Sequence, residues 1–200
     1  MATRGSMITS DKHKIHWWGI GANGSASMFW AFTNLFKMPF SKGAGGRRNN
    51  YEKDSFKKGY KKIVNMRNPY EWITAVLFDH GYLDDFENHI KNNLMNLICI
   101  SQVKKWEEDG FTPDYFIKCD DMYNSLLEIP ELKKETEELG DELLFTINTP
   151  DYDELGKGRQ RLVEGGWKQY WNQELVDVLL SNKYANKLFE LTGYDKESWK

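Results

Sequence analysis

The sequence predicts an α/β fold of three layers, in which a central parallel sheet of about four to five strands is flanked by helices. Two observations support this class. Short runs of β-branched and aromatic residues alternate with longer runs of helical period. The first such run leads through a glycine-rich turn into an apolar helix, which is how a doubly wound fold begins. We expect one domain over residues 7–200 and exclude residues 1–6, which read as a scar of the expression vector.

Strands are predicted where short apolar runs are bounded by turn-forming residues. They are expected at residues 14–20, 62–66, 115–119 and 143–147. Helices are expected at residues 26–37, 69–81 and 84–108, in two short segments after residues 121 and 130, and from residue 172 to about 191. Strands that alternate with helices imply a parallel sheet with helices on both faces.

Residues with special backbone preferences mark the ends of the expected helices. Pro39 stops the first helix, and Pro69 suits the first turn of the second, where its missing N–H costs nothing. Gly110 ends the long amphipathic helix at 84–108. Asn172 can cap the last helix, with Glu174 in its first turn.

The net charge of −3 says little about partners, but its distribution is uneven. Nine Lys and Arg residues lie between residues 37 and 62, against two acidic residues. This segment suits either an anionic ligand or polyanionic partner, or a solvated loop. Nucleic acid is disfavoured as a partner because the segment lacks interleaved aromatic residues.

The two cysteines are expected to be free thiols. Because no apolar run reaches membrane-spanning length, we expect a cytoplasmic protein with no membrane partner.

The glycine-serine segment at residues 19–28 (GIGANGSASM) joins the first strand to the first helix. Backbone N–H groups in such a turn, together with the helix dipole, bind phosphate or sulfate oxygens. The alternative is a tight turn that needs glycine for its backbone alone. The segment lacks the Gly-Lys-Ser/Thr of a Walker A loop, and no spacing of His, Cys or carboxylates suggests a metal site.

Arg67 follows the second strand, in the segment 66–72 (MRNPYEW). At the carboxyl end of a central strand its guanidinium would face the crevice where such folds bind ligands, and it could hold a phosphate. The alternative is a surface arginine paired with a carboxylate such as Glu71.

The order of these segments resembles that of the sulfotransferase family that uses 3′-phosphoadenosine 5′-phosphosulfate (PAPS). The resemblance rests on residues 21–28 (GANGSASM), 64–71 (VNMRNPYE), 115–122 (YFIKCDDM) and 166–171 (GWKQYW), and is nearest to the carbohydrate-acting branch. It implies a P-loop-like fold, PAPS as co-substrate and 3′-phosphoadenosine 5′-phosphate (PAP) as product, with no metal. The nucleotide-binding residues that it implies are Gly21, Ala22, Asn23, Gly24, Ser25, Ala26, Ser27, Met28, Arg67, Thr74, Arg159, Arg161, Trp167 and Lys168.

The resemblance implies transfer of a sulfuryl group to a hydroxyl or amine of an acceptor such as a carbohydrate. Candidates for the general base are His16, His80 and Glu71. Two positions depart from the family pattern, because Ala22 replaces its lysine and Ala75 its serine. These departures leave open a catalytically weak or inactive homologue that binds PAPS or PAP. A further alternative, which rests on the basic segment at residues 37–62, is a polyanion-binding module.

Overall fold

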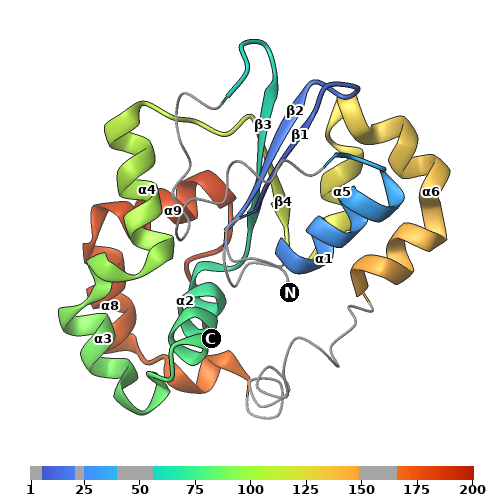
Figure 1. Ribbon diagram of the computed structural model, residues 1–200. Helices are drawn as coiled ribbons and strands as arrows, with labels where there is room; N and C mark the ends of the chain where they lie inside the picture. The colour runs from blue at the N-terminus through green and yellow to red at the C-terminus, as the bar shows by residue number, and fades with distance from the viewer. Residues whose placement is uncertain (1–5, 21–24, 40–55, 149–165) are drawn as a thin grey trace. The chain divides into compact units, whose positions relative to one another are not determined.

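The computed structural model describes residues 6–20, 25–39, 56–148 and 166–200 (Figure 1). The chain forms two compact units. The first unit contains Met1–Met66 and Phe111–Glu154, and the second contains Arg67–Gly110 and Leu155–Lys200. Each unit is described below by itself.

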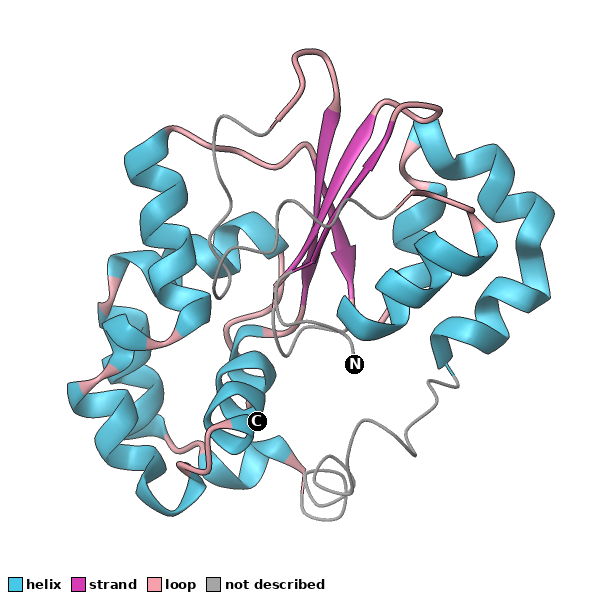
Figure 2. Cartoon of the chain, in the orientation of Figure 1, coloured by secondary structure: helices cyan, strands magenta, loops and turns pink. Residues whose placement is uncertain are grey.

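The first unit contains a four-stranded sheet in the order β1-β2-β3-β4 (Figure 2). Its strands are β1 (Ser6–Ser10), β2 (Ile15–Gly19), β3 (Lys61–Met66) and β4 (Tyr115–Lys118). The three strands expected at 14–20, 62–66 and 115–119 are confirmed as β2, β3 and β4, and these three strands run parallel to one another. β1 was not expected and pairs antiparallel with β2, so the sheet is mostly parallel. Ser6, assigned above to the vector scar, begins this strand.

Three helical segments lie beside one face of this sheet (Figure 1). They are α1 (Ser25–Trp30), continued by the π-helical turn η1 (Ala31–Leu35), then α5 (Met122–Leu127) and α6 (Pro130–Asn148). Trp17 from β2 packs among their apolar side chains, and its indole Nε1 donates to Asn65 Oδ1 at 2.5 Å. Trp18, on the next position of the strand, is also buried. Both tryptophans are therefore core residues.

The strand expected at 143–147 is wrong, because this segment is the last part of α6. Leu143 and Ile147 are both buried, whereas Phe145 between them is 69% exposed. A spacing of four between buried residues is the helical period, and a strand would have placed all three on one face. Gly140 interrupts the helix with φ at +42°.

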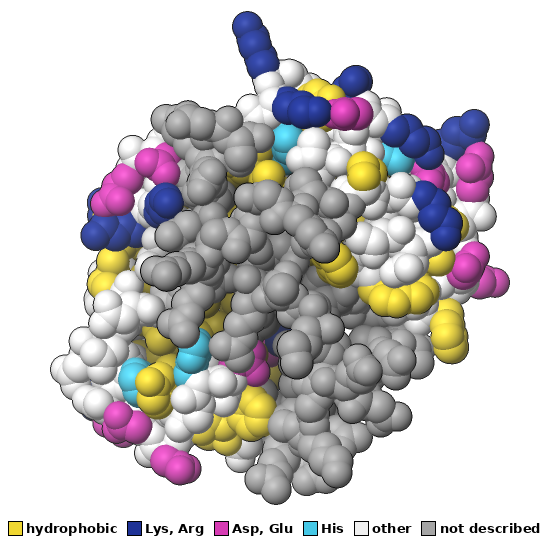
Figure 3. Space-filling view, in the orientation of Figure 1, with side chains coloured by type: hydrophobic (Ala, Val, Ile, Leu, Met, Phe, Trp, Pro, Cys, Tyr) yellow, Lys and Arg dark blue, Asp and Glu magenta, His cyan; other side chains and the backbone are white. Residues whose placement is uncertain are grey.

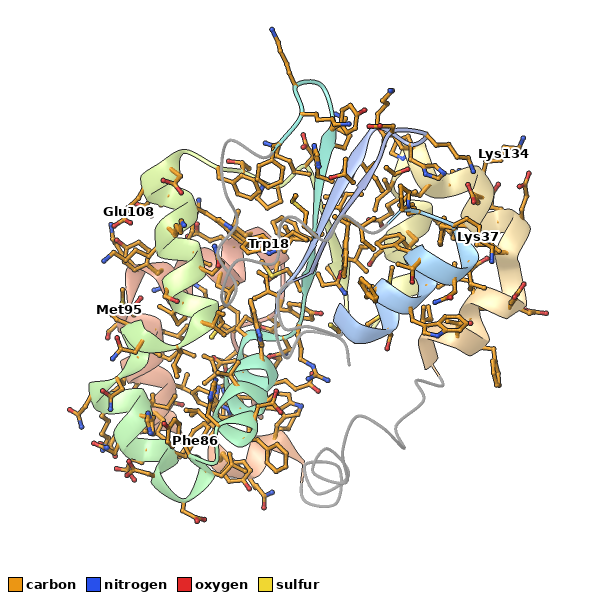
Figure 4. The ribbon with its side chains drawn as sticks, viewed as in Figure 1. Trp18, Lys37, Phe86, Met95, Glu108 and Lys134 are labelled. Carbon is orange, nitrogen blue, oxygen red and sulfur yellow. The ribbon has the colours of Figure 1, made fainter. Side chains whose placement is uncertain are left out.

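The second unit is helical in its described part. Its segments are α2 (Pro69–Asp79), η4 (Leu83–Asp85), α3 (Phe86–Asn92), η5 (Leu94–Asn96), α4 (Ile98–Asp109), η6 (Trp167–Tyr170), α8 (Gln173–Ser181) and α9 (Lys183–Thr192). Asn68 caps α2, with Pro69 at its first position, and Gly110 ends α4 in the left-handed region. The Phe86 side chain packs against Tyr170 within this unit (Figure 4).

Asparagines divide two helices that the sequence predicted as continuous. The expected helix at 84–108 breaks at Asn93, and Leu97 is extended before α4 begins. The expected helix at 172–191 divides at Asn182, whose side chain accepts from the N–H groups of Tyr184 and Ala185. Asparagine competes for backbone hydrogen bonds in this way, and it therefore starts helices better than it continues them.

Within the described segments, no helix has both the length and the apolar character needed to cross a bilayer. Cys99 and Cys119 are free thiols, as expected. Burial raises the pKa of the Cys99 thiol to about 12, so it stays protonated and inert.

Candidate functional site

The glycine-serine segment lies between β2, which ends at Gly19, and α1, which begins at Ser25. Residues 21–24 and the side chains of Ser25 and Ala26 lie outside the described part of the chain. Ser27 is half-buried, while Met28 is fully buried with its side chain in the core of the first unit. The strand and the helix expected on either side of this segment are therefore present, and Met28 is a packing residue.

Arg67 stands immediately before α2 in the second unit. Its Nη2 lies 3.2 Å from Glu71 Oε1, and the two side chains are 30% and 31% exposed. The ion pair that the sequence offered as the alternative for Arg67 is thus present. A partly exposed pair of this kind contributes on the order of 1 kcal/mol, so a phosphate could displace Glu71 at small cost.

Tyr70, in the first turn of α2, is the centre of this region. Its side chain is fully buried, and its hydroxyl donates to the backbone oxygen of Lys196 at 2.6 Å. Burial, followed by the charges of Glu197 and Asp195, raises the pKa of Tyr70 well above its usual range. The phenol is therefore a permanent hydrogen-bond donor and ties the C-terminal residues to the start of α2.

Trp167 and Lys168, the first two residues of η6, lie near Tyr70 and the start of α2. The Trp167 ring is stacked on Tyr70, with centroids 6.3 Å apart and planes at 5°. Lys168 Nζ lies 5.6 Å from the centroid of the Trp167 ring. The half-buried indole and its neighbouring lysine thus lie beside the first turn of α2, the helix that Arg67 precedes, and groups of this kind suit a ligand with a planar ring and an anionic group.

Thr74 belongs to the same cluster but has a structural role. It is fully buried, donates to the backbone oxygen of Tyr70 at 2.8 Å, and accepts from Trp171 Nε1 at 3.0 Å. Its hydroxyl is therefore engaged in the core of the unit. The neighbouring Ala75 is buried and supplies no hydroxyl to replace it.

His16 is held by both ring nitrogens at the amino-terminal end of β2. Nε2 accepts from the Lys57 N–H at 2.7 Å, so Nδ1 carries the proton and faces Thr9 Oγ1 at 2.8 Å. Burial, followed by the charge of Lys57, lowers the pKa of His16. The glycine-serine segment follows the opposite end of β2, so the described geometry gives His16 a structural role.

The remaining base candidates differ in position. Glu71 is engaged with Arg67. His80 follows the carboxyl end of α2, so a helix of 11 residues separates it from Arg67. That length is about 16 Å at 1.5 Å per residue, so His80 cannot contact a phosphate held at Arg67.

The sequence analysis named Arg67, Thr74, Trp167 and Lys168 as candidate site residues but did not single out Tyr70 and Trp171, which contact two of them. Both side chains are buried and bond to groups that no local pattern places near them. Arg159 and Arg161 lie outside the described residues.

Comparisons with protein-family models, with curated proteins and with solved structures find no match to this chain.

Proposed function

We propose that the chain binds PAPS and transfers its sulfuryl group to a hydroxyl or amine of an acceptor such as a carbohydrate. The observation that supports this is the stacking of Trp167 on Tyr70, which brings Trp167 and the neighbouring Lys168 to the helix start that follows Arg67. Two sequence segments that are almost one hundred residues apart meet there, in the combination of cation and aromatic plane that the family resemblance implies. PAPS would supply the sulfuryl group and the leaving nucleotide.

Each of these residues fits one part of a phosphorylated nucleoside. The Arg67 guanidinium and the start of α2 would hold the 3′-phosphate, and Trp167 offers a ring on which the adenine can stack. Lys168 adds a second positive charge beside that ring. Tyr70 would not touch the ligand, since it is fully buried and holds Trp167 in position.

A nucleotide-binding protein that does not catalyse transfer is the second candidate. The Thr74 hydroxyl, next to the position of the family's phosphate-binding serine, is used within the core. Ala75 and Ala22 supply neither the serine nor the lysine of the family pattern. Binding and catalysis must therefore be measured separately.

The test is a thermal-unfolding titration of the full chain with PAP. A ligand bound to the native state at 100 times its Kd adds about 2.7 kcal/mol to the free energy of unfolding. We expect Tm to rise with PAP, and the weaker binding of Arg67→Ala to reduce that rise to about half or less. Lys183→Ala is the matched control, because Lys183 forms an ion pair with Glu107 at the same distance of 3.2 Å in the same unit. This control should leave the rise intact.

The outcomes separate the two candidates. No rise in Tm at millimolar PAP would contradict both. A rise that depends on Arg67, followed by transfer of labelled sulfate from PAPS to members of a glycan panel, supports the sulfotransferase. The same rise without transfer to any hydroxyl or amine acceptor selects the binding protein.

A further inference from the structure

The amino-terminal edge of the parallel strands in the first unit carries a cluster of lysines. This lysine edge consists of Lys14, Lys57, Lys58, Lys61 and Lys62. Lys14 comes from the turn between β1 and β2, and the others come from the start of β3 and the segment before it. Parallel pairing brings them together, since Ile15 is opposite Lys61 and the Lys61 N–H donates to the Lys14 oxygen at 2.8 Å.

Two carboxylates only partly balance these charges. Lys57 Nζ lies 2.6 Å from Asp11 Oδ1, whereas Lys61 and Lys62 reach Asp114 only at 3.9 and 4.0 Å. With five lysines against Asp11 and Asp114, the lysine edge has a net charge of +3. Dark blue side chains are visible along this end of the first unit in the space-filling view (Figure 3). The surface therefore attracts anions.

Aromatic rings lie between the lysines. Lys14 and Lys57 lie 5.2 and 5.4 Å from the centroid of the Tyr60 ring, and Lys62 lies 5.1 Å from that of Phe111. Phe56 packs on Phe111 with centroids 5.2 Å apart. All three rings are partly exposed. The expectation that the basic segment lacks interleaved aromatics is wrong, because Phe56 and Tyr60 lie within it, and the fold adds Phe111 from the connection between α4 and β4.

We propose that the lysine edge binds single-stranded nucleic acid without sequence preference. Lysine ammonium groups spread over the ends of several strands suit a chain with regularly spaced phosphates better than one compact anion. Rings among them suit bases that stack, and base stacking tolerates any sequence. This surface lies at the end of β2 opposite the glycine-serine segment, so the proposal is independent of the nucleotide-binding function.

Other partners fit this surface less well. Its described residues form strand ends and loops, and none of them belongs to a helix that could enter the major groove of a duplex. Among the described residues, the large apolar side chains exposed enough to enter a bilayer are Trp30, Tyr82 and Phe145, which belong to other segments. A sulfated glycan would use the lysines but has no planar base to stack on the rings.

The test is fluorescence anisotropy of a labelled 20-nucleotide oligo-dT, titrated with the full chain at several salt concentrations. The slope of log K against log salt is about −0.7 per phosphate neutralised on a single strand. The variant Lys14→Gln/Lys58→Gln removes two lysines for which the structure shows no ion pair. We expect it to make the slope shallower by about 1.4 and to weaken binding on the order of tenfold at 0.1 M salt.

The matched control is Lys133→Gln/Lys134→Gln, which removes the same charge from exposed positions on α6 in the same unit (Figure 4). It should leave the slope and the affinity unchanged. Absence of salt-dependent binding of oligo-dT, or equal losses in the two double variants, would overturn the proposal.

An aromatic variant separates nucleic acid from other polyanions. Phe111→Leu keeps an apolar side chain but removes the ring, and we expect about tenfold weaker binding of oligo-dT. Binding of a heparin fragment of similar charge should not change, and the Tm of the variant checks that it folds. If the heparin fragment bound as tightly as oligo-dT and Phe111→Leu affected neither, the surface would bind polyanions generally and the nucleic-acid proposal would be wrong.

Discussion

Tyr60 and Tyr70 lie in two regions that each combine a tyrosine with lysine and aromatic side chains. The two tyrosines differ in their burial and in the group that accepts the hydrogen bond of their hydroxyl. At the lysine edge, the half-buried Tyr60 donates its hydroxyl to Asp11 Oδ1 at 2.5 Å, and lysines lie near its ring. In the second unit, Tyr70 is fully buried and donates to a backbone oxygen. Its ring lies 4.8 Å from that of Trp171, measured between centroids.

The difference indicates what each region can do. Exposed charges exchange partners easily, because an ion pair in water is weak and is screened by salt. The lysine edge can therefore trade its internal contacts for those of a polyanion. A buried ring surrounded by other rings has fixed neighbours, so Tyr70 can hold Trp167 and the start of α2 in a constant geometry for a small ligand.

The largest predicted difference in stability is between the two tyrosines themselves. Tyr70→Ala should lower the free energy of unfolding by about 3–5 kcal/mol, because it leaves a cavity among aromatic residues. Tyr60→Ala should cost distinctly less, since water can fill the space at the edge. Urea unfolding of both variants makes the comparison. Equal losses would show that packing does not distinguish the two regions.

The next effect concerns the hydrogen bond behind Tyr70. Thr74→Val removes the acceptor of Trp171 Nε1–H, and an unsatisfied buried donor costs about 1–3 kcal/mol. Trp171→Phe in the Thr74→Val background should cost less than in the wild type, because the orphaned donor is then absent. A double-mutant cycle measures this coupling energy. Additive losses would mean that the bond contributes nothing to stability.

A smaller effect, which depends on pH, is expected at the lysine edge. The pKa of His16 is lowered from 6.5 by burial and by Lys57, so the unfolded state binds the proton more tightly. The neutral imidazole therefore contributes to the free energy of unfolding above pH 6.5, and this contribution is lost as the pH falls through the pKa that His16 has in the folded state. Urea unfolding between pH 7.5 and 5.5 should show falling stability, and His16→Gln should flatten that fall. An equally steep fall in the variant would assign the pH dependence to other groups.

The smallest change in thermal stability is expected for Lys57→Gln. Lys57 is exposed and bonded to Asp11, which is itself exposed, so its loss should change Tm least among these variants. The difference from the wild type should shrink further in high salt. A Tm loss as large as that of Tyr60→Ala would mean that the Lys57–Asp11 pair is a structural element of the edge.

The parts of the fold that the sequence predicted are those with strong local signals. Pro69 and Gly110 have backbones that fix a helix start and a helix end, and the runs at β2 and β3 have clear strand composition. The failures occurred where local and tertiary preferences conflict. Residues 143–147 have strand composition, but Leu143 and Ile147 share a buried helical face.

The candidate site was predictable only as separate parts. Arg67, Trp167 and Lys168 were named from the order of the segments, and the structure stacks Trp167 on Tyr70 in the first turn of the helix that follows Arg67. The roles of Tyr70 and Thr74 depend on partners far along the chain, such as the backbone of Lys196 and the indole of Trp171, which no sequence pattern identifies.

We propose that Arg67 binds the 3′-phosphate of PAP and that Glu71 pairs with its guanidinium when no ligand is bound. Calorimetric titration of PAP into the wild type, Arg67→Ala and Glu71→Gln tests this proposal. Because Glu71→Gln removes a competing negative charge 3.2 Å from the guanidinium, its Kd should equal or fall below that of the wild type. Arg67→Ala should raise the Kd about tenfold or more, as expected for a lost charge-assisted hydrogen bond. Equal affinities for all three proteins would show that Arg67 and Glu71 are only a surface ion pair and would contradict the account.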